Sequence, residues 1–255
     1  MEKLTSVQNP MIRRLKSLND SKVRKKEHAC LVEGEVMIGE ALASGLKPLE
    51  AIFEKATALG ARLHAQGVQV RLCSRNVLES VCETVSPQGC CASFSIPEAA
   101  TIHPSAHLLV ALDGVQDPGN MGTILRTMDA AGFEGAYLSG LCADVYSPKV
   151  QRSAMGSAFR IPTQRVDLPE TARKLKAQGY QLFVSDLDGK DLYESSFSSE
   201  DGLLLVIGNE AKGVSEEMKA LSDHRVKIPM RGRAESLNAA VAAGILMYEL
   251  TRPKR

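Results

Sequence analysis

The apolar residues of the first hundred positions follow two spacings in turn. Short apolar runs predict strands at residues 30–32, 49–53, 68–72 and 90–96. Between them, helical spacing predicts helices at residues 8–18, 36–44, 59–66 and 76–82. Strands and helices of this length in alternation are typical of a small α/β unit.

The pattern changes after residues 97–105, where two prolines stand among small and polar residues and indicate a linker. Beyond it the apolar runs are continuous, which is typical of parallel strands covered by helices on both faces. These strands are predicted at residues 108–112, 135–138, 182–185, 203–207 and 226–228, and the helices at residues 120–131, 148–158, 169–178, 215–221 and 236–250. The sequence therefore predicts two α/β domains, at residues 1–98 and 106–255.

Positive charge is concentrated near the start of the chain. Residues 1–26 contain eight Lys and Arg and only two acidic residues, although the formal net charge of the whole chain is +1. A cluster of this kind attracts a phosphate backbone, so we predict an RNA-binding surface; the alternative is a solvated helix face. The predicted RNA contacts are Arg13, Arg14, Lys22, Arg24, Lys25 and Lys26.

Cysteine usage and hydropathy argue against a metal site and a membrane protein. The six cysteines form no CxxC pair and have no histidine at a metal-ligand spacing, so we expect no bound metal. No stretch of about 18 apolar residues could span a membrane, and the first residues lack the apolar run of a signal peptide. We therefore expect a cytoplasmic protein with reduced thiols.

Three segments after predicted strands carry polar residues, at the strand ends where open α/β sheets bind ligands. The first, DGVQDPGN, leads into a helix with an apolar stripe that includes Ile124 and Met128. At about 100° per residue, Arg126 faces away from this stripe. Taken alone, a helix capped by Asn120 with a solvated Arg126 explains the segment.

The second segment, GNEAKGVS at residues 208–215, has the GxxxxG spacing of a P-loop at Gly208 and Gly213. Val214 stands where a P-loop requires lysine, and Glu210 would place a carboxylate beside the phosphates. A nucleoside triphosphate site is therefore not expected. The glycines better suit a ligand that the backbone approaches closely.

The third segment, IPMRGRAESLN at residues 228–238, opens a helix that is apolar or small on nearly every side. Such a helix must be buried, and Ser236 is a natural N-cap for it. Burial explains neither Asn238 in its first turn nor the neighbouring Arg231 and Arg233.

Together the three segments resemble the motifs of the SpoU/TrmH branch of the SPOUT methyltransferases. The motif NxGxxxR matches Asn120, Gly122 and Arg126, the motif GxExxG matches Gly208, Glu210 and Gly213, and the motif IPMxGxxxSLN matches Ile228, Pro229, Met230, Gly232, Ser236, Leu237 and Asn238. Residues 9–34 also resemble the ribosomal-protein-like substrate-binding domain of this family. That second likeness favours an rRNA-type member over a tRNA-type member.

The resemblance implies an α/β catalytic domain of the SPOUT type, with a parallel sheet covered by helices and a C-terminal trefoil knot. It implies S-adenosylmethionine as the cofactor, held in the knot mainly by backbone. The implied cofactor contacts are Ile207, Gly208, Gly213, Ile228, Met230 and Leu237, with Ile207 and Met230 as apolar walls for adenine. It also implies a homodimer, which a small helix face at residues 239–244 would allow.

The implied reaction is an in-line displacement at the sulfonium methyl group by a ribose 2′-hydroxyl of RNA. In this family the usual base is the arginine of the first motif, here Arg126. A guanidinium hardly loses its proton in a protein, so gripping a phosphate is an equally good function for Arg126. Glu210 and Asn120 would then hold Arg126 and the ribose, and Ser236 and Asn238 would complete the pocket.

Other functions fit parts of the sequence. A tRNA methyltransferase shares the three motifs. An RNA-binding ribosome assembly factor without activity would keep the basic first domain, but the intact Asn120, Arg126, Glu210 and Asn238 argue against it. A dinucleotide-binding oxidoreductase is not expected, because no GxGxxG follows a predicted strand.

Overall fold

A computed structural model of the chain describes residues 3–97, 101–193 and 202–252. Its internal contacts divide the chain into two units: Met1–Glu98 with Tyr146–Phe159, and Ala99–Val145 with Arg160–Arg255. The sequence placed Tyr146–Phe159 in the second domain, whereas this segment packs within the first unit. Of the predicted linker, residues 98–100 lie outside the described residues, and residues 101–107 form neither helix nor strand.

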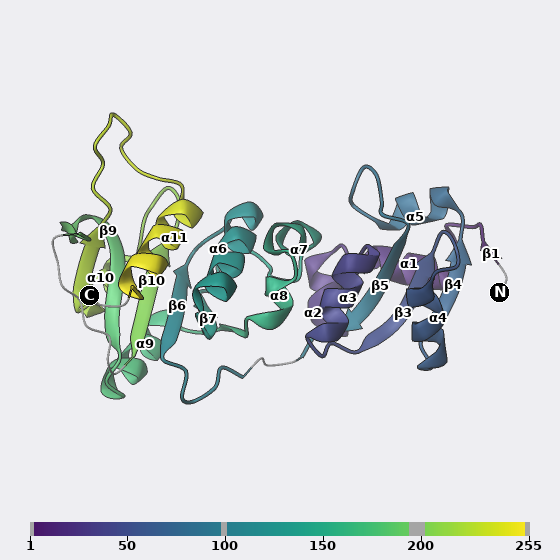
Figure 1. Cartoon of the computed structure of the whole chain (residues 1–255), viewed down its shortest axis with the longest axis horizontal. Coiled ribbons are helices and arrows are strands. Elements are labelled where there is room, and N and C mark those ends of the chain that lie inside the picture. Colours follow the sequence, from purple (N-terminus) through teal and green to yellow (C-terminus); the bar gives the residue numbers. More distant parts are fainter. Residues whose placement is uncertain (1–2, 98–100, 194–201, 253–255) are drawn as a thin grey trace. The chain divides into compact units, whose positions relative to one another are not determined.

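The strands of the first unit are β1 (Lys3–Leu4), β2 (Ala29–Glu33), β3 (Pro48–Phe53), β4 (Gln69–Cys73) and β5 (Cys90–Ser95). They form a mixed sheet in the order β1-β4-β3-β5-β2, in which β5 is antiparallel to both of its neighbours (Figure 1). The helices are α1 (Pro10–Ser17), α2 (Ser21–Glu27), α3 (Glu35–Ala43), α4 (Ala58–Ala65), α5 (Arg75–Val81) and α7 (Pro148–Ala154), while α8 (Ser157–Arg160) ends one residue beyond the unit.

Side chains of the first sheet alternate between two apolar cores, because successive residues of a strand point to opposite faces. In β2, Cys30 and Val32 pack with α3 and α4, whereas Ala29 and Leu31 pack with α1 and α5. Phe159 of α8 joins the cluster on the side of α3 and α4. The first unit is therefore a sheet covered by helices on both faces.

A buried glutamine anchors α7 in the first unit. Gln151 is 3% exposed, and its Nε2 donates to the carbonyl oxygens of Leu31 (2.9 Å) and Tyr146 (2.8 Å). The single helix predicted here is two helices instead. Met155 and Gly156, with φ of 50° and 91°, adopt left-handed conformations that end α7 before α8 begins.

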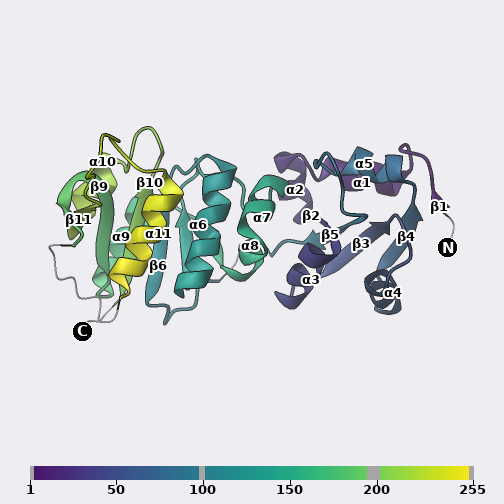
Figure 2. The ribbon, with the colours of Figure 1, turned by 45° about the horizontal axis from the view of Figure 1, so that its top comes forward.

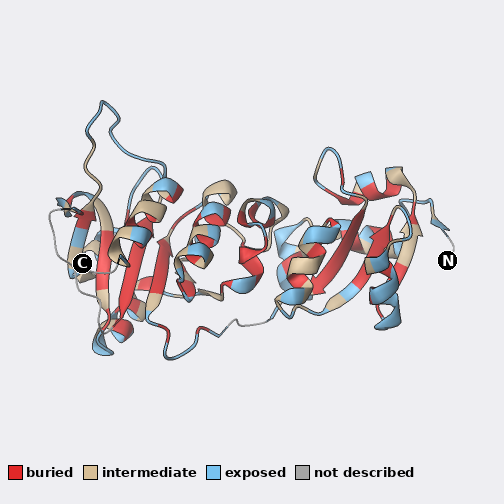
Figure 3. Cartoon of the chain, in the orientation of Figure 1, coloured by how far each residue is buried: buried red, intermediate tan, exposed pale blue. Residues whose placement is uncertain are grey.

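The strands of the second unit are β6 (Leu108–Asp113), β7 (Gly135–Leu138), β8 (Thr163–Arg165), β9 (Gln181–Asp191), β10 (Leu203–Gly208) and β11 (His224–Lys227). They form a sheet in the order β11-β9-β10-β6-β7-β8, with each neighbouring pair parallel. The predicted parallel α/β fold is thus confirmed. All of β10 is buried (Figure 3), as its continuous apolar run predicted.

The helices of the second unit are α6 (Pro118–Ala131), α9 (Leu168–Ala177), α10 (Glu216–Leu221) and α11 (Ala239–Leu250). Leu175 of α9 and Met218 of α10 pack with Val184 and Val206 of the sheet. Helices α6 and α11 lie side by side, and α11 also contacts β10 (Figure 2).

Two helix starts differ from those predicted. The cap of α6 is Asp117, whose Oδ1 accepts from the Asn120 backbone N–H at 2.8 Å, so Asn120 is not the cap. The cap of α11 is Asn238, whose Oδ1 accepts from the Ala240 N–H at 2.9 Å. The prediction of Ser236 as this cap is wrong, because the chain remains non-helical until Asn238.

Candidate functional site

The first two polar segments begin side by side because their strands are neighbours. In the pairing of β6 with β10, Gly208 lies opposite Asp113. The loops that follow are joined directly: Asn209 Nδ2 donates to Gly114 O at 2.8 Å, and the Ser215 N–H donates to Asp113 Oδ2 at 2.9 Å. This sheet edge therefore presents both segments as one surface.

Side chains from all three polar segments meet in a short hydrogen-bonded chain. Asn120 Nδ2 donates to Glu210 Oε1 at 2.9 Å, and Asn120 Oδ1 accepts from Asn238 Nδ2 at 2.8 Å. These residues are 90 and 118 positions from Asn120 in the sequence. The structure thus brings together three of the five predicted catalytic residues.

The orientation of each amide in this chain follows from its partners. Asn238 must direct its oxygen toward α11, because Oδ1 accepts from the N–H groups of Ala240 and Val241. Only its NH₂ group then remains for Asn120, which must accept with its own oxygen. The NH₂ group of Asn120 is left to face Glu210, and a carboxylate is the matching acceptor.

Asn209 holds the second loop in place through hydrogen bonds, a function that was not predicted from the sequence. Its Oδ1 accepts from the backbone N–H groups of Ala211 (3.0 Å) and Lys212 (3.1 Å), while its Nδ2 holds Gly114 of the first loop. Asparagine often makes such turns with the backbone two residues further along. Asn209 thereby fixes the backbone on both sides of Glu210.

The two glycines of the second loop are explained by the loop itself. A Cβ atom at Gly208 would overlap the peptide between Gly213 and Val214. Gly213 has φ of 69°, in the left-handed region that favours glycine. The backbones of Asn209 and Gly213 also exchange two hydrogen bonds, of 3.0 and 2.9 Å. Gly208 is therefore needed for the tight turn even without a ligand.

A third loop, at residues 139–143, is hydrogen-bonded to the first one. Its Ser139 Oγ accepts from the Gly114 N–H at 2.9 Å. Arg165 at the end of β8 binds this loop with its guanidinium, donating to the carbonyl oxygens of Ser139, Gly140, Cys142 and Ala143 at 2.8 to 3.3 Å. One side chain thus fixes the loop that supports Gly114.

Arg126 lies outside the hydrogen-bonded chain. It is exposed on α6, whereas Ile124 is fully buried, as the helical spacing predicted. Within the part of the chain that the structure describes, its guanidinium makes no hydrogen bond or ion pair. Arg126 is therefore available to an external anion.

The third segment is an open loop. Residues 231–238, including Ser236, are exposed, and Ile228 and Met230 are half-buried. Leu237 is an apolar side chain with 36% of its surface exposed. Across the described residues, no backbone N–H or C=O group of residues 229–237 bonds to another part of the chain. Both apolar surface and backbone groups are thus free for a ligand.

The basic residues of the first unit fall into two groups. Arg13, Lys22, Lys25 and Lys26 are exposed, as an RNA-binding surface requires. Arg24 is only 4% exposed, and its Nη1 donates to the carbonyl oxygens of residues 18 and 19 at 2.7 Å.

Arg14 is likewise engaged inside the first unit. Its side chain forms ion pairs with Glu27 (3.1 Å) and Glu50 (2.5 Å). The prediction that Arg24 contacts RNA does not fit its burial, and Arg14 has less freedom to do so than the predicted surface assumed. Both arginines stabilise the helices on which the exposed lysines stand.

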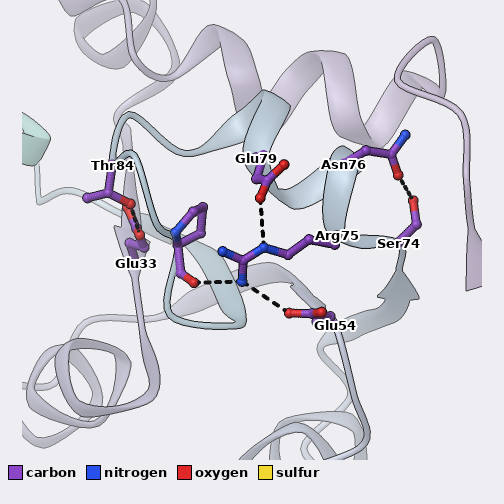
Figure 4. A network of polar contacts seen from close by, with 8 residues as sticks. Glu33, Glu54, Ser74, Arg75, Asn76, Glu79 and Thr84 are labelled. Atoms are coloured by element: carbon purple, nitrogen blue, oxygen red, sulfur yellow. Dashed lines mark hydrogen bonds and ion pairs between the residues drawn. The ribbon is translucent and has the colours of Figure 1, made fainter.

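Arg75, also in the first unit, ties a helix to a loop (Figure 4). Its guanidinium donates to Glu79 (2.8 Å), Glu54 (3.3 Å) and the carbonyl oxygen of Pro87 (3.0 Å). These carboxylate partners raise the pKa of Arg75, and the hydrogen bond with Glu79 contributes most. This arginine therefore serves the fold.

The six cysteines are all buried. Burial raises the pKa of Cys73 to about 11 and that of Cys90 to about 12, so the thiolates of these two residues are scarce at neutral pH. In the described part of the chain, no group of three or more His, Cys, Asp and Glu is arranged to hold a metal ion, and no helix is long and apolar enough to cross a membrane.

Comparison with known protein families identifies the chain. The model of the SpoU rRNA methylase family matches residues 107–248, which include all three polar segments. This chain belongs to that family. The family predicted from the sequence motifs is confirmed, and residues 9–92 also match the MRM3-like substrate-binding domain.

Two relatives of this SpoU family member cover nearly its whole length, and a third covers little more than half. The 23S rRNA (guanosine(2553)-2′-O)-methyltransferase RlmP of Bacillus subtilis is 36% identical over 98% of this chain and 99% of its own. The AdoMet-bound rRNA methyltransferase of Sinorhizobium meliloti is 32% identical, with a TM-score of 0.89 over 98% of this chain and 97% of its own. The TrmH/SpoU tRNA modifying enzyme of A. aeolicus, 30% identical, covers 59% of this chain and 76% of its own, with a TM-score of 0.51.

Proposed function

We propose that this SpoU family member transfers a methyl group from S-adenosylmethionine to a ribose 2′-hydroxyl of structured RNA, and that this RNA is rRNA. The proposal rests on the hydrogen-bonded chain from Glu210 through Asn120 to Asn238, which joins the three family motifs at one sheet edge. Two full-length relatives are named as rRNA methyltransferases, and one of them is bound to AdoMet.

The third segment fits the cofactor. Adenine needs apolar walls and backbone partners for its polar edge, and this loop offers Ile228, Met230 and Leu237 together with unbonded backbone groups. Ile207 is 2% exposed at the end of β10, so it would form the floor of such a site. Gly208 and Gly213 keep the adjoining turn narrow. When bound, the cofactor supplies an electrophilic methyl group.

The residues of the hydrogen-bonded chain would orient the ribose that accepts the methyl group. Asn120 is held from both sides, because its hydrogen bonds with Glu210 and Asn238 set the orientation of its amide. Arg126 is free to grip a phosphate next to the reacting ribose. Ser236 lies two residues before Asn238 and would line the same pocket. Alignment of the hydroxyl with the sulfonium methyl is the contribution that this arrangement supports best.

The first unit favours rRNA over tRNA as substrate. It matches a substrate-binding domain, and the tRNA modifying enzyme covers only 59% of the chain. Exposed Arg13, Lys22, Lys25 and Lys26 would bind RNA phosphates and present the target to the second unit. We propose this action in the cytoplasm. An inactive assembly factor remains the second candidate, and it predicts the same RNA binding without transfer.

We also propose a homodimer and a C-terminal trefoil knot, as in the family resemblance. Of the small face of α11, Ala240 and Ala243 are buried within one copy and Gly244 faces Thr127 of α6. The exposed apolar residues of this segment are instead Leu237, Val241 and Tyr248. Sedimentation of the purified protein should show two copies per particle.

Transfer can be tested with the purified protein, labelled S-adenosylmethionine, and rRNA and tRNA from cells that lack the protein. We expect label in one ribose of large-subunit rRNA, and the same yield after treatment with chelator. Label in tRNA alone would favour the tRNA alternative. RNA binding without any label would favour the assembly factor, and loss of transfer after chelation would contradict a metal-free reaction.

A further inference from the structure

The arginines of the second unit divide sharply by their partners. Arg160, Arg165, Arg173, Arg225 and Arg252 each bind a carboxylate or backbone carbonyl groups of the chain. Among the residues described by the structure, only Arg126, Arg231 and Arg233 of this unit lack such a partner. These three all belong to motif segments of the proposed active site.

Arg231 and Arg233 stand on a loop that is fixed at both ends and open between them. At its start, the Leu192 N–H donates to Lys227 O at 3.0 Å. At its end, Asn238 is bound to Asn120 of the hydrogen-bonded chain. Since the loop is tied to the residues that would orient the ribose, RNA bound there would pass near its exposed arginines.

The charge of these arginines favours RNA over S-adenosylmethionine as their ligand. S-adenosylmethionine carries a sulfonium, an ammonium and one carboxylate, so its net charge is positive and a pair of arginines would not favour it. RNA offers phosphates, which match the planar fork of a guanidinium. An arginine that already bound a carboxylate of the chain would have to break that pair first, and neither Arg231 nor Arg233 has to.

We propose that Arg231 and Arg233 bind phosphates that flank the methylated nucleotide, so that the loop of the third motif holds RNA as well as cofactor. This inference rests on the proposed function. It adds a second RNA contact, on the catalytic unit, to the basic surface of the first unit. Its loss should weaken RNA binding and leave cofactor binding intact.

The test compares the full-length double variant Arg231→Gln/Arg233→Gln with Arg173→Gln/Lys174→Gln. The control removes the same two charges from α9, where both residues are exposed and form surface ion pairs. Binding to large-subunit rRNA transcribed in vitro is measured at several salt concentrations, and binding to S-adenosylmethionine is measured by calorimetry. A third measurement is the rate of a single turnover at saturating RNA.

The loop variant should bind RNA about tenfold more weakly than wild type near 0.15 M salt, and its dependence of log affinity on log salt should be shallower by about 1.5 to 2. The control should remain within about twofold of wild type, as should cofactor affinity in both variants. RNA affinity of the loop variant equal to that of the control would overturn the proposal, and so would a parallel loss of cofactor affinity. If wild type binds RNA but transfers nothing, the proposed function fails, while the binding comparison still tests this inference.

Discussion

Arginines that bind carboxylates or carbonyl oxygens of the chain occur in both units, but the units differ in where arginine charge is left without an internal partner. In the first unit, Arg14, Arg24 and Arg75 spend their hydrogen bonds on carboxylates and carbonyl oxygens of the chain, and the exposed charge comes mainly from lysines. Among the described residues of the second unit, the arginines without partners are confined to the motif segments. A count of basic residues therefore points to the wrong side chains in the first unit, whereas the absence of internal partners points to the site in the second.

The largest effect should come from the buried member of the basic cluster. Arg24→Ala leaves one buried and one partly buried carbonyl oxygen without this donor, and we expect a loss of about 3 kcal/mol in the free energy of unfolding. Arg13→Ala is the matched control on a neighbouring helix, with an expected change below about 0.5 kcal/mol. Urea titration measures both. Equal stability of the two variants would show that Arg24 is no different from a surface charge.

The next effect concerns the hydrogen-bonded chain. Asn238→Asp keeps the oxygen that caps α11 but replaces the donor facing Asn120 with an acceptor. Turnover should fall on the order of 100-fold, because misplacement of aligned groups has costs of this size. The melting temperature should hardly change.

Asn238→Ala separates the two functions of this residue. It removes both the cap and the donor, so it should lose the same activity and also about 1 kcal/mol of stability. Turnover of Asn238→Asp near that of wild type would remove Asn238 from the orienting group.

A smaller effect is expected at Arg165, which fixes a loop beside the site. Arg165→Lys keeps the charge but cannot bind four carbonyl groups, so the loop at residues 139–143, which is hydrogen-bonded to Gly114, should relax. We expect turnover to fall about tenfold with unchanged RNA affinity. Arg173→Lys, in a surface ion pair, is the control and should be neutral. A drop in melting temperature without any change in turnover would limit Arg165 to a structural function.

The smallest effect is expected on the first unit. Lys25→Glu/Lys26→Glu changes two exposed residues and spares Arg24, so the fold should persist. RNA affinity should weaken about fivefold at 0.15 M salt, with a shallower salt dependence. Filter binding against wild type measures this. Unchanged affinity would mean that RNA passes over another face of the first unit.

The sequence predicted elements whose signals are local. The apolar run at residues 203–207 became β10, and Asn9 with Pro10 opened α1, where Asn9 Oδ1 accepts from the Met11 N–H. Helix α2 was missed because SKVRKKE offers a single apolar residue, and β8 was missed because TQR offers none. The packing of Tyr146–Phe159 with the first unit was not predicted, because helical spacing does not say which sheet a helix will cover.

The same limit applies to the site. Asn120, Glu210 and Asn238 could be picked from the motifs, and their meeting at one sheet edge follows from the order of the strands. Asn209 and Arg165 could not be assigned functions, because most of their partners are backbone carbonyl or N–H groups, which every residue carries. A contact with a backbone group does not require any particular residue type at the partner's position, so the sequence does not reveal it.

The packing of Tyr146–Phe159 also bears on how such a protein can be inherited. The chain passes from one unit to the other after residues 98, 145 and 159, so the units are not consecutive modules in the gene. A recombination event within the linker would deliver a catalytic half still carrying Gln151 and Phe159, and a first unit missing both. A first unit taken from a relative would then have to fit the Tyr146–Phe159 segment of the chain that receives it. This requirement favours descent of the two units as a pair.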